Sequence, residues 1–223
     1  FIVLRCLLTR YVMCFGMTTK HSSWVKMAYE KFASTLHRLP KGIERDGGRE
    51  YLAEAEAWER EKNIYASEVS EAYRPDHNGG AEVDVLMVQG HIKTDTSIGG
   101  TSGVWWIEAG QYGCIIEDLR NGSFRRVHGD AATRKALQNI MPWGWRVSFV
   151  KEIPERKIHG GKANLVNNAV VGFFAGICAG SGWIKVAYYA NGKPKIAETF
   201  RPGIMMSSTI KSKIILFIKV FAV

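Results

Sequence analysis

Apolar and aromatic residues recur at helical spacing in two stretches near the start of the chain. The first stretch follows two serines that can cap a helix, and its apolar positions are four residues apart: Trp24, Ala28, Phe32 and Leu36. The second stretch covers residues 49–73 and places aromatic side chains seven residues apart: Tyr51, Trp58 and Tyr65. Glutamates occupy its other face. The pattern predicts two helices, joined by a turn-rich linker over residues 41–48.

From residue 81 onwards the pattern changes to short apolar runs bounded by small and polar residues. Residues 83–92, 104–107 and 112–119 are predicted to be strands, with a loop over residues 94–103. Two glycines, Gly110 and Gly113, are typical of a bulge at the start of the third strand.

Two Asn-Gly pairs predict tight hairpins in the later part of the chain. Asn121-Gly122 would place Asp118 opposite Arg125 and Glu117 opposite Arg126, so that unlike charges face each other. A second hairpin at residues 191–192 would pair Lys185 with Glu198, Ala187 with Ile196, and Trp183 with Phe200. Pro194 lacks a backbone N–H, so residues 193–200 are predicted to form an edge strand. Between the hairpins we expect a short helix over residues 131–140, capped by Asp130, and a strand over residues 145–153.

These elements predict an α+β fold. We expect an N-terminal helical layer of two helices, followed by a mainly antiparallel β-sheet or sandwich with one short interrupting helix. The expected divisions are a leader or non-native extension over residues 1–20, a helical hairpin region over 21–78, a β-rich domain over 81–203 and an apolar tail over 204–223.

The first 29 positions contain basic residues and no acidic residue, a composition typical of an organellar transit peptide. The alternative is a leader without a targeting role. At the other end, the apolar run over residues 214–221 is too short to cross a bilayer and suits a strand. We expect an intracellular protein, with organellar targeting as the alternative.

Charge is sorted along the 223 residues more sharply than the net charge of +9 indicates. Residues 1–49 carry a net charge of +6, residues 50–118 of −10 and residues 119–223 of +13. A basic half favours an anionic partner, but it can also pair with the acidic middle of the same chain.

Flat aromatic side chains are interleaved with cations in the basic half, a combination that suits phosphates and stacked bases. The candidate residues for binding nucleic acid or another anion are Arg120, Arg125, Arg126, Arg134, Lys135, Trp143, Trp145, Arg146, Lys151, Arg156 and Lys157. The predicted function is therefore a non-enzymatic binding protein, with nucleic acid as the first choice of partner and anionic lipid as the second. Self-association through the apolar tail or the edge strand 193–200 is a further expectation.

An uncharged run over residues 163–184 supports a different hypothesis. Three glycines spaced by four, Gly172, Gly176 and Gly180, would form a groove on a helix, as in membrane-inserting proteins. The simpler interpretation is a pair of buried, closely packed strands.

An enzyme is the third hypothesis, with a site between the 94–103 loop and the His128/Asp130 turn. It requires His91, His128 and a carboxylate within hydrogen-bond reach of one another. The four cysteines show no C-x-x-C pair and the six histidines are scattered, so neither a metal nor a cofactor is predicted.

Overall fold

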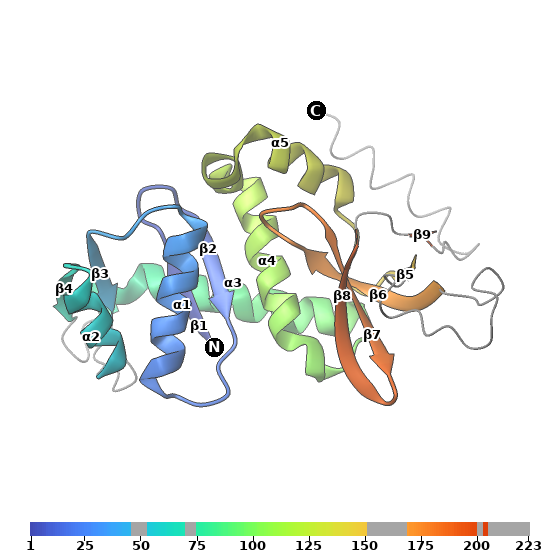
Figure 1. The fold of residues 1–223 in the computed structure, drawn as a ribbon, viewed down its shortest axis with the longest axis horizontal. Coiled ribbons are helices and arrows are strands. Elements are labelled where there is room, and N and C mark those ends of the chain that lie inside the picture. Colours follow the sequence, from blue (N-terminus) through green and yellow to red (C-terminus); the bar gives the residue numbers. More distant parts are fainter. Residues whose placement is uncertain (46–52, 70–74, 151–168, 200–202, 205–223) are drawn as a thin grey trace, which may run out of the picture.

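The computed structural model describes residues 1–45, 53–69, 75–150, 169–199 and 203–204 (Figure 1). It confirms the α+β class: helices dominate the N-terminal part, and an antiparallel sheet forms the C-terminal part. Helix α4 (Trp106–Arg120) stands between the N-terminal strands and the C-terminal sheet and packs against both. The predicted domain boundaries remain a prediction.

The residues expected to form a leader pack into the fold. Strands β1 (Ile2–Arg5) and β2 (Val12–Phe15) form an antiparallel hairpin. Tyr11 belongs to the main hydrophobic core, while Val12 and Cys14 are buried against residues of the central helices. Burial of these side chains makes the hairpin an integral part of the structure.

Helix α1 (Ser22–Thr35) begins where the sequence predicts, but its cap is different. The N-cap is His21, whose Nδ1 accepts a hydrogen bond from the Ser23 N–H at 3.3 Å. Ala28 of the predicted stripe is buried, but the other buried apolar side chains each lie one position after a predicted one: Val25, Tyr29 and Ala33. Tyr29 packs on Trp58 of the following helix, which explains why this face turns inward.

The second predicted helix is much shorter than residues 49–73. Strand β3 (Gly42–Arg45), helix α2 (Glu54–Glu61) and strand β4 (Tyr65–Val69) form a unit in which the two strands pair in parallel. The helix stops because Asn63 adopts a left-handed φ of +51°, which asparagine tolerates. Trp58 is buried as predicted, whereas Tyr65 leaves the helix and is 79% exposed on β4.

The three strands predicted between residues 83 and 119 are wrong. Residues 83–92 lie in helix α3 (Pro75–Ile98), and α4, preceded by a short 3₁₀ turn (Gly103–Trp105), covers residues 112–119. The buried positions of α3 include Asp84 and Val88, whereas Leu86 is exposed. Because the buried residue at position 84 is an aspartate and Leu86 is exposed, the spacing of apolar residues alone does not show the helical period of α3.

The glycines predicted to form a bulge serve helix packing instead. A Cβ atom on Gly113 would lie 2.4 Å from the Cβ of His91 on α3, and one on Gly110 would lie 3.2 Å from Val88 and Ile92. Only glycine at position 113 lets α3 and α4 approach this closely.

The first predicted hairpin, at Asn121-Gly122, is also wrong. These residues connect α4 to helix α5 (Ser123–Asn139), and the expected pairs of Asp118 with Arg125 and Glu117 with Arg126 do not form. Helix α5 is interrupted at Gly129, and the residues after this break form the short helix predicted over 131–140. Asparagine and glycine therefore form a corner between two helices here.

The C-terminal sheet has five antiparallel strands in the order β8-β7-β6-β5-β9. Their bounds are Arg146–Val150 for β5, Ala169–Ile177 for β6, Ile184–Ala190 for β7, Lys193–Thr199 for β8 and Gly203–Ile204 for β9. Helix α4 packs on this sheet, where Tyr112 meets Phe174 edge to face at a centroid distance of 5.2 Å. The Tyr112 hydroxyl donates to the carbonyl of Met141 at 2.8 Å, so its polar end is satisfied in the core.

The second predicted hairpin is confirmed. Strands β7 and β8 pair Lys185 with Glu198 and Ala187 with Ile196, and β8 is an edge strand. Asn191 and Gly192 both have positive φ, +53° and +72°, as a type I′ turn requires. The expected partner of Trp183, Phe200, lies outside the described residues.

The glycine-spaced segment is stranded where it is described. Residues 169–177 form β6, followed by a turn into β7, so the helical groove of Gly172, Gly176 and Gly180 does not form. A Cβ on Gly172 would lie 2.4 Å from the Ala187 carbonyl oxygen, so this glycine serves close strand packing. Within the described ranges, no helix has the length and apolar character of a membrane span.

Candidate anion-binding surface

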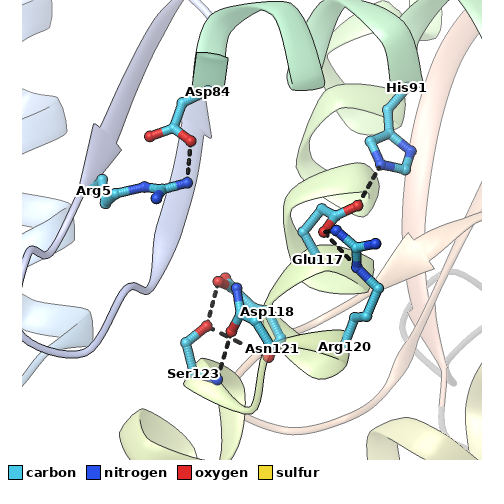
Figure 2. A network of polar contacts seen from close by, with 8 residues as sticks. All are labelled: Arg5, Asp84, His91, Glu117, Asp118, Arg120, Asn121 and Ser123. Carbon is cyan, nitrogen blue, oxygen red and sulfur yellow. Dashed lines mark hydrogen bonds and ion pairs between the residues drawn. The ribbon is translucent and has the colours of Figure 1, made fainter. Parts of the chain in front are cut away.

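The α4–α5 corner is built on a buried carboxylate (Figure 2). Asp118 is fully buried; it accepts a hydrogen bond from the Ser123 hydroxyl and another from the Val12 N–H at 3.1 Å. Burial raises its pKa to about 7, although the bonds from Ser123 and Val12 act in the opposite direction. The carboxyl group of α4 is thereby hydrogen-bonded both to β2 and to the first residue of α5.

Two further polar contacts fix α3 in this region (Figure 2). Arg5 of β1 forms an ion pair with Asp84, whose pKa is raised by burial and lowered in part by that guanidinium. Glu117 lies between His91 Nε2, at 3.7 Å, and Arg120 Nη2, at 2.6 Å. Arg120 of the candidate set is therefore paired with a carboxylate of its own helix.

His128 is engaged at the other side of the corner. Its Nε2 lies 2.9 Å from the Tyr11 hydroxyl, and its ring packs against Phe124 at a centroid distance of 4.6 Å. Burial, and then the nearby charge of His37, lower the pKa of His128. This contact joins the start of α5 to β2.

The cations of α5 face solvent in different states of pairing. Arg125 pairs with Asp130, while Arg126 donates to the carbonyl oxygens of Thr9 at 3.1 Å and Asn121 at 3.3 Å. Carbonyl oxygens orient a guanidinium without neutralising its charge. Arg134 is exposed, and the ammonium of Lys135 lies 6.0 Å from the centre of the Trp183 ring.

The remaining candidate residues divide into exposed, buried and undescribed ones. Arg146, at the start of β5, is exposed. Trp143 is only 5% exposed and presents no ring face for stacking, whereas Trp145 is half-buried; both pack against the main core. Lys151, Arg156 and Lys157 lie outside the described residues.

The glutamates of the acidic middle have their own partner. Arg45 of β3 lies 3.3 Å from Glu56 and 3.3 Å from Glu59, and the pKa of Glu59 is raised by burial against the pull of Arg45. Lys62 pairs with Glu61. In the described ranges, the ion pairs of α2 therefore leave the cations of α5 and β5 untouched.

A second group of cations, which the sequence did not predict, lies around the turn between β1 and β2. Arg10 is exposed on this turn, Arg38 at the end of α1 lies 3.5 Å from the Cys6 sulfur, and Arg126 reaches Thr9. These arginines are far apart in sequence. Only the packing of α1 and α5 against the hairpin brings them together, so no local signal could have found the group.

The residues of the enzyme hypothesis have separate partners. His91 lies near Asp95 and Glu117, whereas His128 contacts Tyr11. Residues 94–98 continue α3, which shortens the predicted loop. Among the described side chains, no group of three or more histidine, cysteine, aspartate or glutamate residues is placed to hold a metal ion.

A shallow depression of about 500 Å³ lies beside the end of α1. Its lining includes Glu30, His37, Arg38 and Lys62, so it carries both signs of charge. This mixture does not select an anionic or a cationic ligand.

No model of a known protein family matches the chain, and no curated protein sequence matches it.

Proposed function

We propose that the protein binds polyanions, with nucleic acid as the first partner, through the exposed cations of α5 and β5. The observation that supports this function is the exposure of Arg126, Arg134 and Arg146, for which the described part of the chain supplies no carboxylate partner. Three glutamates of the acidic helix α2 are engaged with Arg45 and Lys62.

Binding through these residues rests on phosphate contacts. Guanidinium groups form two parallel hydrogen bonds to a phosphate and release condensed counterions from the nucleic acid. Burial of Trp143 removes one of the two tryptophan rings expected to stack on bases, so phosphate contacts carry most of the binding. The proposed binding is therefore independent of base sequence and strongly dependent on salt.

Filter binding of a labelled single-stranded DNA, repeated across a series of salt concentrations, tests this function. The logarithm of affinity should fall with the logarithm of salt concentration, with a slope of roughly −0.7 for each phosphate contacted. The double variant R134A/R146A should bind roughly tenfold more weakly, because both guanidinium groups are exposed and neither has a carboxylate partner in the described ranges.

The matched control is R60A, which removes an exposed arginine from the acidic helix α2 and should leave the affinity unchanged. Absence of binding at low salt, or an affinity that does not vary with salt, contradicts the proposal. An equal loss of affinity per removed charge in R60A and R134A/R146A would show that only total charge matters and would remove the assigned surface.

A further inference from the structure

The turn between β1 and β2 holds two leucines out in solvent. Leu7 is 77% exposed and Leu8 is 76% exposed. The turn is well defined: the Cys6 N–H donates to the Tyr11 carbonyl at 2.9 Å, and the Arg10 N–H donates to the Cys6 carbonyl at 2.7 Å. Since Tyr11 is buried directly after it, the turn is anchored at its base and apolar at its tip.

Three arginines surround this apolar tip. Arg10 follows the leucines on the same turn, Arg38 approaches Cys6, and Arg126 donates to Thr9. All three are exposed, and none forms an ion pair with a described residue. The neighbouring Arg125 pairs with Asp130 of the same helix, so that this carboxylate does not neutralise Arg126.

We propose that this turn docks the protein on an anionic lipid surface. Leu7 and Leu8 enter the boundary between the headgroups and the acyl chains, and Arg10, Arg38 and Arg126 contact the lipid phosphates. The backbone hydrogen bonds of Cys6, Arg10 and Tyr11 lie at the base of the turn and hold its shape while the two leucines project.

The combination of side chains favours lipid over nucleic acid as the occupant of this turn. A nucleic acid offers phosphates to the arginines but no apolar layer for two aliphatic side chains. An anionic membrane offers both an apolar layer for the leucines and phosphates for the arginines. Lipid docking shares only Arg126 with the proposed nucleic-acid surface; Leu7, Leu8, Arg10 and Arg38 belong to the turn alone, so the inference does not depend on nucleic-acid binding.

Vesicle flotation tests the inference with the full chain. The probes are vesicles of phosphatidylcholine alone and vesicles containing about one-third phosphatidylserine, a composition that presents a negative surface potential. The wild-type protein should float with the anionic vesicles. The variant L7A/L8A should lose roughly tenfold or more in partitioning, because most of the inserted apolar surface is removed.

Two further variants distinguish insertion of the two leucines from unspecific hydrophobic adsorption and measure the electrostatic contribution of the arginines. L86A/L137A removes two exposed leucines from α3 and α5 and should float like the wild type. R10A/R38A should lose binding to anionic vesicles, and the loss should be largest at low salt. Circular dichroism checks that each variant is folded.

Wild-type protein that does not float overturns the proposal, as does undiminished flotation of L7A/L8A. Equal losses in L86A/L137A and L7A/L8A would also overturn it, because adsorption would then be unspecific. Retention of DNA binding by L7A/L8A supports separate surfaces, so that failure of one proposal leaves the other intact.

Discussion

The chain contains the same dipeptide at two corners, and the two corners have different structures. Asn121-Gly122 turns one helix into the next, with Asn121 at a helical φ of −88°. Asn191-Gly192 closes a β-hairpin, with Asn191 at a φ of +53°. The glycine is left-handed in both places, at +76° and +72°, so the asparagine makes the difference.

The flanking residues decide which conformation the asparagine takes. Beside the first corner, Asp118 is fully buried and Asn121 Oδ1 accepts the Ser123 N–H at 2.8 Å, a local side-chain turn from which helix α5 starts with Gly122 as its N-cap. Beside the second corner, the β-branched and aromatic residues of β7 alternate across a sheet. An Asn-Gly pair therefore indicates where the chain turns, and the residues on either side determine whether it joins two helices or two strands.

The largest expected effect concerns the buried carboxyl of the first corner. The pKa of Asp118 is raised from 3.8 to about 7 in the fold, so the folded protein binds more protons than the unfolded chain between these values. The free energy of unfolding, relative to that of D118N, should therefore fall as the pH rises from about 4 to about 7, by an amount on the order of 3 kcal/mol. Urea unfolding of both proteins across this range measures the difference. A difference that is constant or rises with pH would contradict the burial of a carboxyl group here.

A smaller effect tests whether the flank of the first corner is helical. G113A should lower the free energy of unfolding by about 2 kcal/mol, because the new methyl group would overlap the His91 side chain. G90A should raise it by up to about 1 kcal/mol, since Gly90 is exposed on α3 with no atom near its Cβ position. Thermal and urea unfolding measure both. Destabilisation by G90A would indicate that α3 is not a helix at this point.

The smallest effect separates the two asparagines directly. N121G should destabilise the protein by about 1 kcal/mol, because it removes a side-chain hydrogen bond and adds freedom at a helical φ. N191G should stay within about 0.3 kcal/mol of the wild type, since glycine accepts a positive φ readily. Equal changes in the two variants would mean that the corners do not differ as described.

Features with local causes were predictable from the sequence. The β7–β8 register follows from a turn and the residues next to it, and Pro194 marks the edge strand. Lys185 faces Glu198 across the strands, but its ammonium donates to Gln111 of α4 at 3.3 Å.

Features that depend on distant partners were not predictable. Asp84 and His91 occupy inward positions of α3 because Arg5 and Glu117, from other elements, meet them there. The candidate surface shows the same limit. The exposure of Arg134 and Arg146 could be anticipated from composition, but the approach of Arg38 and Arg126 to the β1–β2 turn depends on tertiary packing.

The turn that carries the two leucines also holds Cys6, the only one of the four cysteines whose thiol pKa is lowered. Partial burial opposes ionisation of Cys6, but hydrogen bonds from Thr9, Leu8 and Arg38 outweigh it and lower the pKa of the thiol. Burial raises the pKa of the other three thiols, those of Cys14, Cys114 and Cys178. A limiting amount of an alkylating fluorophore at neutral pH therefore attaches first at Cys6, next to Leu7. A fluorophore attached to Cys6 would therefore report contacts of the turn around Leu7 and Leu8, and no cysteine needs to be introduced.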